Sequence, residues 1–134
     1  MTPLGPVTHI VIHHSASPRT TTAADIKRWH EERGWHDIGY HLVIEGDARL
    51  VWGRPLSECG AHCPPNMGRV GICVVGDNTK PEHRWTEDQQ DALERVVGAF
   101  TLLWPDARVC GHRDLRATEC PGLEVADLWP PKAS

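Results

Sequence analysis

Three side chains of this sequence, two histidines and one cysteine, have the types and spacing to hold a metal ion. His13 ends a β-branched run, His112 follows a later apolar run, and Cys120 stands eight positions after His112. Two imidazoles and one thiolate suit a zinc site with an open fourth position, which a water molecule or a substrate can take. The alternative is that both histidines lie at loop edges and that Cys120 is a buried thiol.

Strands and helices must bring these ligands together. Two capping boxes, Thr22 before Asp25 and Thr86 before Gln89, predict helices that end near residues 33 and 104. Apolar and β-branched runs predict strands over residues 7–14, 40–45, 49–52, 70–75 and 108–110, and a short helix is expected over 123–128. The expected fold class is α/β: a single domain over residues 1–134 with a central mixed β-sheet flanked by helices on both sides.

The apolar positions of the two helices predict which faces meet the sheet. Ile26 and Trp29 are expected to form the apolar face of the first helix. The second helix carries four apolar residues at helical spacing: Leu93, Val96, Val97 and Phe100.

Composition excludes several classes of protein. A net charge of −4 with 24 % charged residues is unlike a nucleic-acid-binding protein, so no nucleic-acid partner is expected. No apolar run is long enough for a transmembrane helix, so no membrane partner is expected, and the first residues do not resemble a secretory signal. The odd count of five cysteines indicates no complete disulfide framework, and a bond between Cys59 and Cys63 stays open.

Four stretches together resemble one enzyme family. They read "VIHHSAS", "RGWHDIGYHLVIEGDARLVWGR", "VGICVVGDN" and "GHRDLRATECPG". In order and spacing they are similar to the type 2 N-acetylmuramoyl-L-alanine amidases, which include amidase-type phage lysozymes and the peptidoglycan recognition proteins. The resemblance implies a mixed sheet between helices and Zn²⁺ held by His13, His112 and Cys120.

The resemblance also gives roles to residues around the metal. It places Tyr40 at the start of a core strand with its hydroxyl near the zinc, where a phenol can orient or deprotonate a water molecule or donate to a developing oxyanion. His41, the next residue, is expected to be a buried, hydrogen-bonded support. Thr118 stands where some members have a catalytic lysine and where active recognition proteins have threonine. His62 matches a position that often lines the substrate groove, and the alternative is a plain loop histidine.

The function implied by the resemblance is hydrolysis of the amide between N-acetylmuramic acid and L-alanine in bacterial peptidoglycan. We expect a monomeric, endolysin-like zinc amidase, made in the host cytoplasm without a signal peptide and acting on the cell wall after release. Two alternatives stay open: a non-catalytic peptidoglycan-recognition module, and a cytoplasmic amidase that recycles anhydro-muropeptides. Because Cys120 is present, the recognition module is the weaker alternative.

Overall fold

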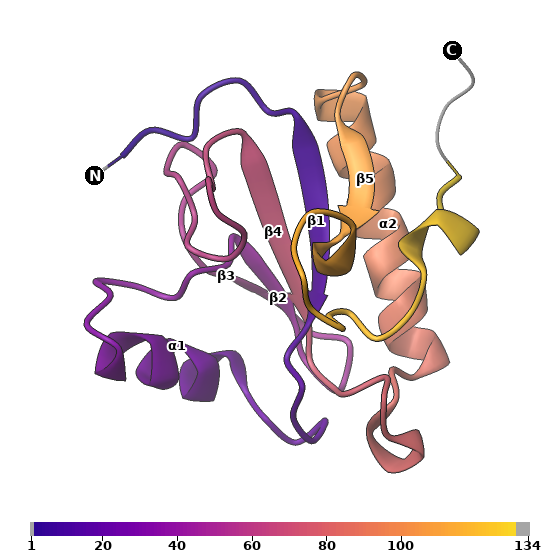
Figure 1. Ribbon diagram of the computed structural model, residues 1–134. Coiled ribbons are helices and arrows are strands. Elements are labelled where there is room, and N and C mark those ends of the chain that lie inside the picture. The colour runs from indigo at the N-terminus through magenta and orange to yellow at the C-terminus, as the bar shows by residue number, and fades with distance from the viewer. Residues whose placement is uncertain (1, 131–134) are drawn as a thin grey trace.

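Five strands form one mixed sheet, and an α-helix packs on each of its faces, as the sequence predicts (Figure 1). The structure is a computed structural model that describes residues 2–130, so the expected domain limits at residues 1 and 134 lie outside the described residues. The strands are β1 (His9–His14), β2 (Leu42–Ile44), β3 (Leu50–Trp52), β4 (Arg69–Val74) and β5 (Arg108–Gly111). Their order is β3-β2-β4-β1-β5, and β3, paired antiparallel with β2, is the strand that makes the sheet mixed.

Both long helices begin at the residues that their capping boxes predict. Helix α1 (Ala23–Glu32) is capped by Thr22 and helix α2 (Glu87–Leu103) by Thr86, and each cap exchanges two hydrogen bonds with the third helical residue. Three short 3₁₀ turns follow strands or loops: η1 (Pro81–His83), η2 (His112–Asp114) and η3 (Val125–Asp127). The helix expected over residues 123–128 is therefore only the single turn η3.

Helix α2 covers one face of the sheet and forms the larger part of the core. Its four predicted apolar residues are buried against side chains such as Ile10, Ile12 and Ile72 of β1 and β4. Burying each side chain of this size contributes about 1.5–3 kcal/mol. This packing stabilises the sheet from one face, so polar side chains can lie on the opposite face.

Helix α1 covers only part of that opposite face. Ala23 and Ile26 pack on Val43 and Cys73. The predicted apolar face was wrong at Trp29, which is 39 % exposed, because the residues facing the sheet are spaced three and four apart and include His30 instead.

The rest of this face is covered by loops. Val11 of β1 packs beneath Cys63, Cys110 and Leu115. The five cysteines all lie within residues 2–130 and are free thiols, so Cys59 and Cys63 are not joined by a disulfide here. No helix in the described part of the chain is long and apolar enough to span a membrane.

Candidate metal centre

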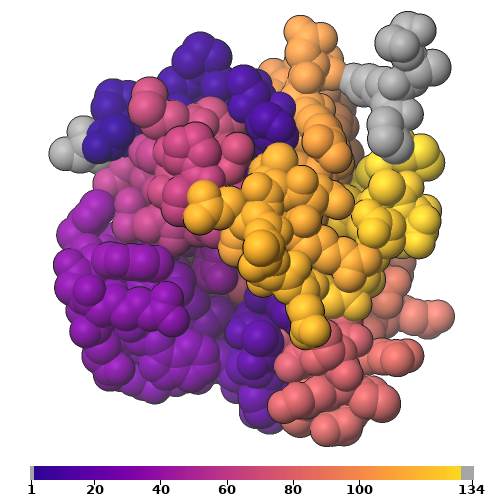
Figure 2. All heavy atoms as spheres, in the orientation of Figure 1, coloured from indigo at the N-terminus to yellow at the C-terminus, as the bar shows by residue number. Residues whose placement is uncertain are grey.

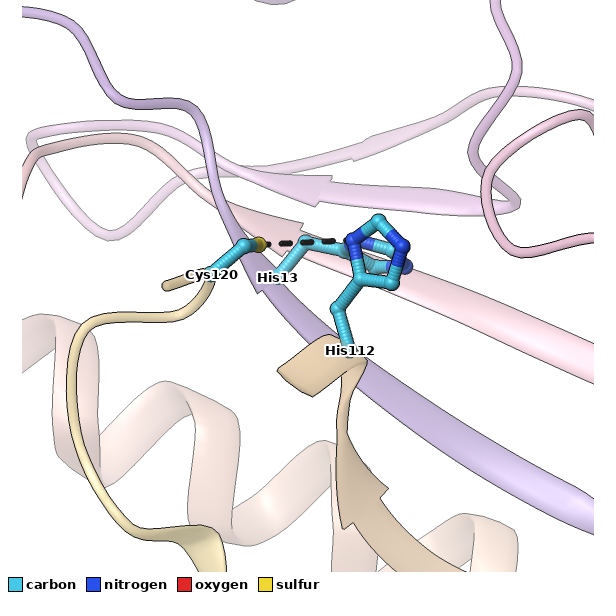
Figure 3. A group of neighbouring side chains, drawn as sticks. All are labelled: His13, His112 and Cys120. Carbon is cyan, nitrogen blue, oxygen red and sulfur yellow. Dashed lines mark hydrogen bonds between the residues drawn. The ribbon is translucent and has the colours of Figure 1, made fainter. Parts of the chain in front are cut away.

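His13, His112 and Cys120 come together on the sheet face that α1 leaves open (Figure 3). One potential ligand atom from each residue lies within 4.8 Å of the other two. The two imidazole centroids are 4.6 Å apart, and the Cys120 Sγ lies 3.7 Å from Nδ1 of His13. Among residues 2–130 this is the one cluster of three or more such side chains that could hold a metal ion.

The three side chains are held by different kinds of structure. His13 lies within β1, between β4 and β5, so its backbone is fixed by hydrogen bonds to the sheet. His112 opens the η2 turn directly after β5. The Arg113 N–H donates to the Cys120 carbonyl at 2.8 Å, which ties the two loop ligands together. The Asp114 carboxylate accepts from the Gly111 N–H at 2.8 Å and so anchors this loop.

The electrostatics of the three residues suit a soft divalent cation. Burial lowers the pKa of His13 well below its usual value, and burial also lowers the pKa of His112, so both rings are neutral and have a lone pair to offer. Burial raises the pKa of the Cys120 thiol to about 12, so its thiolate needs a neighbouring positive charge. Two neutral imidazoles and one thiol that ionises only beside a cation fit Zn²⁺ with one coordination position left open.

The candidate metal centre lies in a pocket of about 470 Å³. Helix α1 and the loop that carries Cys120 flank the recess, as the purple and orange regions of Figure 2 show. The lining includes the three potential ligands and the three other predicted site residues: His13, His112, Cys120, Tyr40, His62 and Thr118. The structure therefore brings every predicted site residue into one cavity.

Tyr40 lies beside the first ligand. Its ring centroid is 5.0 Å from that of His13. Burial, and then the neighbouring Cys73 and Cys120 thiols, raise the pKa of the Tyr40 phenol well above its usual value, so the hydroxyl keeps its proton. The prediction that Tyr40 starts the strand was wrong by two residues, because β2 begins at Leu42. The Tyr40 carbonyl nevertheless accepts a hydrogen bond from the Arg54 N–H at 2.9 Å.

Thr118 and His62 occupy different levels of the pocket. Thr118 is exposed, and its Oγ1 accepts from the Cys120 N–H at 3.2 Å, so its own proton is available to a ligand. His62 is 9 % exposed and lies behind His13, with its Nδ1 2.9 Å from Nε2 of that ligand. The neighbour of Tyr40, His41, is fully buried and hydrogen-bonded to the Glu58 carbonyl and the Gly71 N–H, which confirms its predicted supporting place.

The prediction missed three residues of helix α1 and its C-terminal loop. His30, Arg33 and Trp35 line the same pocket. The His30 ring packs on Trp35 at 4.6 Å and on Tyr40 at 5.5 Å, while Arg33 lies 5.6 Å from the Trp35 ring. The spacing of His30 from Ala23 and Ile26 is the signal that could have placed it on the inner side of the helix.

Comparisons with known proteins agree with the resemblance. The family model described as N-acetylmuramoyl-L-alanine amidase matches residues 3–123. The endolysin of Klebsiella phage KP32 is 31 % identical over 90 % of this chain and 83 % of its own length. Peptidoglycan-recognition protein LB of Drosophila melanogaster is 35 % identical over 94 % of this chain, which spans 60 % of that relative.

Solved structures show the same architecture. The N-acetylmuramoyl-L-alanine amidase LysC from Clostridium intestinale superposes with a TM-score of 0.80 at 30 % identity, over 92 % of this chain and 86 % of that one. A mutant of the Drosophila recognition protein LB, in complex with tracheal cytotoxin, superposes with a TM-score of 0.81 at 30 % identity, over 100 % of this chain and 91 % of that one. From its sequence and its fold, this chain belongs to the N-acetylmuramoyl-L-alanine amidase family.

Proposed function

We propose that this chain is a zinc-dependent amidase that hydrolyses the bond between N-acetylmuramic acid and L-alanine in peptidoglycan. One observation carries the proposal. The ligand atoms of His13, His112 and Cys120 converge within 4.8 Å in an open pocket that also contains a protonated phenol, Tyr40. This is the arrangement that metal-assisted hydrolysis of an amide requires: a Lewis-acid site next to a hydrogen-bond donor.

Each residue of the pocket has a role in this proposal. Bound zinc supplies a Lewis acid that polarises the scissile carbonyl and lowers the pKa of a water molecule towards neutrality. The Tyr40 hydroxyl donates a hydrogen bond to the carbonyl oxygen as negative charge develops on it. Because burial and its neighbours keep the Tyr40 proton in place, donation is favoured over the role of general base. The exposed Thr118 hydroxyl supplies a second, neutral donor, which is weaker than a charged lysine.

The rival function of a non-catalytic recognition module predicts a different site. A protein that only binds peptidoglycan does not need three converging metal ligands or a donor beside them. Here the full set of His13, His112 and Cys120 is present, and their ligand atoms lie within 4.8 Å of one another. The complete ligand set therefore favours hydrolysis.

The relatives support a cellular role. Phage endolysins match this chain over most of their length, and we propose that it too acts on the bacterial cell wall. We also propose that it acts as a monomer. A recycling amidase would instead prefer small soluble muropeptides. Comparing turnover of intact sacculi with turnover of a small muropeptide such as tracheal cytotoxin distinguishes the two roles, and we expect the sacculi to be cleaved.

The decisive experiment joins metal analysis to product analysis. Purified protein is expected to contain one zinc per chain, and a chelator is expected to abolish activity that added zinc restores. Mass spectrometry of digested sacculi should show free stem peptides with a new amino terminus on L-alanine and glycan strands of unchanged length. New reducing sugar ends would mean a glycosidase, and binding without any product would mean a recognition module.

A further inference from the structure

His62 connects a ligand residue to the backbone of the sheet. Its Nδ1 lies 2.9 Å from Nε2 of His13, and its Nε2 lies 2.9 Å from the carbonyl oxygen of Arg69, the first residue of β4. His13 uses its other nitrogen, Nδ1, towards Cys120. The two imidazoles therefore form a chain that runs from the metal site to a backbone carbonyl.

The partners of this chain assign the protons of both rings. A carbonyl oxygen only accepts, so Nε2 of His62 must carry a proton and donate it to Arg69. Because His62 is buried and its ring nitrogens pair with an imidazole and a carbonyl rather than a carboxylate, we take its ring as neutral. Its Nδ1 then has a lone pair and accepts from Nε2–H of His13. That leaves His13 with an unprotonated Nδ1, which is the nitrogen nearest the Cys120 sulfur and the one that can bind a metal ion.

The surroundings of His62 hold its ring in this orientation. The backbone N–H groups of His62 and Cys63 both donate to the Asn66 side-chain oxygen, at 3.0 and 2.8 Å. The ring lies against Gly71 of β4, where an added Cβ would come within 2.7–2.8 Å of three ring atoms. Gly60 leaves similar room, since a Cβ there would lie 2.6 Å from the ring. The backbone on both sides is thus shaped to admit an imidazole at this place.

We propose that His62 is a positioning residue: it fixes His13 in the tautomer whose Nδ1 binds zinc, and it thereby sets the affinity of the metal centre. The inference rests on the proposed zinc site and replaces the substrate-binding role expected from the sequence. A side chain that is 9 % exposed, with both nitrogens already paired inside the protein, has little left to offer a substrate.

Two substitutions separate the hydrogen bond to His13 from simple burial. In His62→Asn, the side-chain oxygen takes roughly the place of Nδ1 and can still accept from His13. In His62→Leu, no acceptor remains, and Nε2–H of His13 is left buried without a partner. Loss of such an outer hydrogen bond typically weakens metal binding about 10–100-fold.

The first measurement is zinc affinity by chelator competition. We expect His62→Leu to bind zinc about 10–100-fold more weakly than the wild type, and His62→Asn to stay within about threefold of it. Gln89→Leu is the matched control, because Gln89 is likewise a buried polar side chain and its replacement removes hydrogen bonds to Thr86, Val75 and Glu45, but it lies on the α2 side of the sheet. It should lower the melting temperature without changing zinc affinity.

The second measurement does not depend on any variant at His62 folding. Long-range ¹H–¹⁵N spectra of histidine-labelled, zinc-free wild type should show His13 as the Nε2–H tautomer, with the resonances assigned from a His13→Asn sample. The inference is overturned if His13 carries its proton on Nδ1, or if folded His62→Leu binds zinc as tightly as the wild type. If the wild-type protein binds no zinc at all, the proposed function fails, while the tautomer of His13 still reports on the role of His62.

Discussion

Acidification is expected to destabilise the protein through His30, which lines the pocket of the candidate metal centre. Its Nδ1 accepts a hydrogen bond from the Gly39 N–H at 2.8 Å, so this nitrogen cannot take up a proton without breaking the bond. Burial, and then the positive charges of Arg33 and Arg54, lower the pKa of His30 from 6.5 to about 4. The folded protein therefore holds this ring neutral at a pH where the unfolded chain protonates it.

The sign and size of the effect follow from this difference. Below about pH 6.5 the unfolded state binds a proton at His30 that the folded state does not bind. The free energy of unfolding is therefore highest above about pH 6.5 and falls as the pH drops towards 4. Each pH unit within that window costs about 1.4 kcal/mol. Between about pH 7 and pH 5, His30 should remove about 1–2 kcal/mol, allowing for solvent near the ring.

The test compares the wild type with His30→Asn, which keeps an acceptor for the Gly39 N–H but has nothing to titrate. Urea unfolding, followed by tryptophan fluorescence with the same chelator in both samples, gives the free energy of unfolding at about pH 7 and pH 5. At neutral pH the variant should be less stable, because it loses ring packing on Trp35 and Tyr40. Its deficit should shrink by about 1–2 kcal/mol at pH 5. A deficit that is the same at both values would show that His30 is protonated freely in the folded state and would refute the reasoning.

Three further outcomes are expected. Zinc binding near pH 7 should release about one proton per ion, measured with an indicator dye. The proton comes from the Cys120 thiol, whose pKa is about 12, while the two ligand histidines are already neutral. No release would contradict the ligand assignment. Tyr40→Phe should keep fold and zinc but lose about 10²–10³-fold in turnover, and a loss below about threefold would return Tyr40 to a packing role. Gly71→Ala should cost about 1–3 kcal/mol in stability and weaken zinc binding, since the new Cβ would displace the His62 ring. Thermal melts measure the stability and chelator competition measures the zinc affinity. An unchanged zinc affinity would show that the position of the His62 ring does not affect metal binding.

Local patterns predicted most of the fold. Thr22 and Thr86 marked the first residues of both helices because a capping box acts within one turn. The apolar runs of β1 and β4 were recognisable because both strands are buried on both faces. The prediction failed at Trp29 because it used a local pattern of apolar residues alone. That pattern does not show that the polar His30, which accepts a hydrogen bond from the Gly39 N–H, occupies the inner side of α1.

The site was predictable only in part. The sequence, through its family resemblance, indicated His13, His112 and Cys120, and the structure brings their ligand atoms together. The position of His62 behind His13 could not be foreseen, because the two residues are 49 positions apart and no periodicity couples them. Their contact depends on how the loop before β4 folds over Gly71, which is a tertiary property.

The distribution of the ligands along the chain determines when the metal centre can form. His13 belongs to the first strand, whereas His112 and Cys120 follow β5, the last strand, which pairs only with β1. A chain that ends at β4 holds four of the five described strands but only one of the three proposed zinc ligands, His13. Under the proposed zinc mechanism, the site is therefore complete only when β5 has docked on β1 and Cys120 is in place. A protein cut short before residue 120 would lack a proposed ligand and is expected to be inactive.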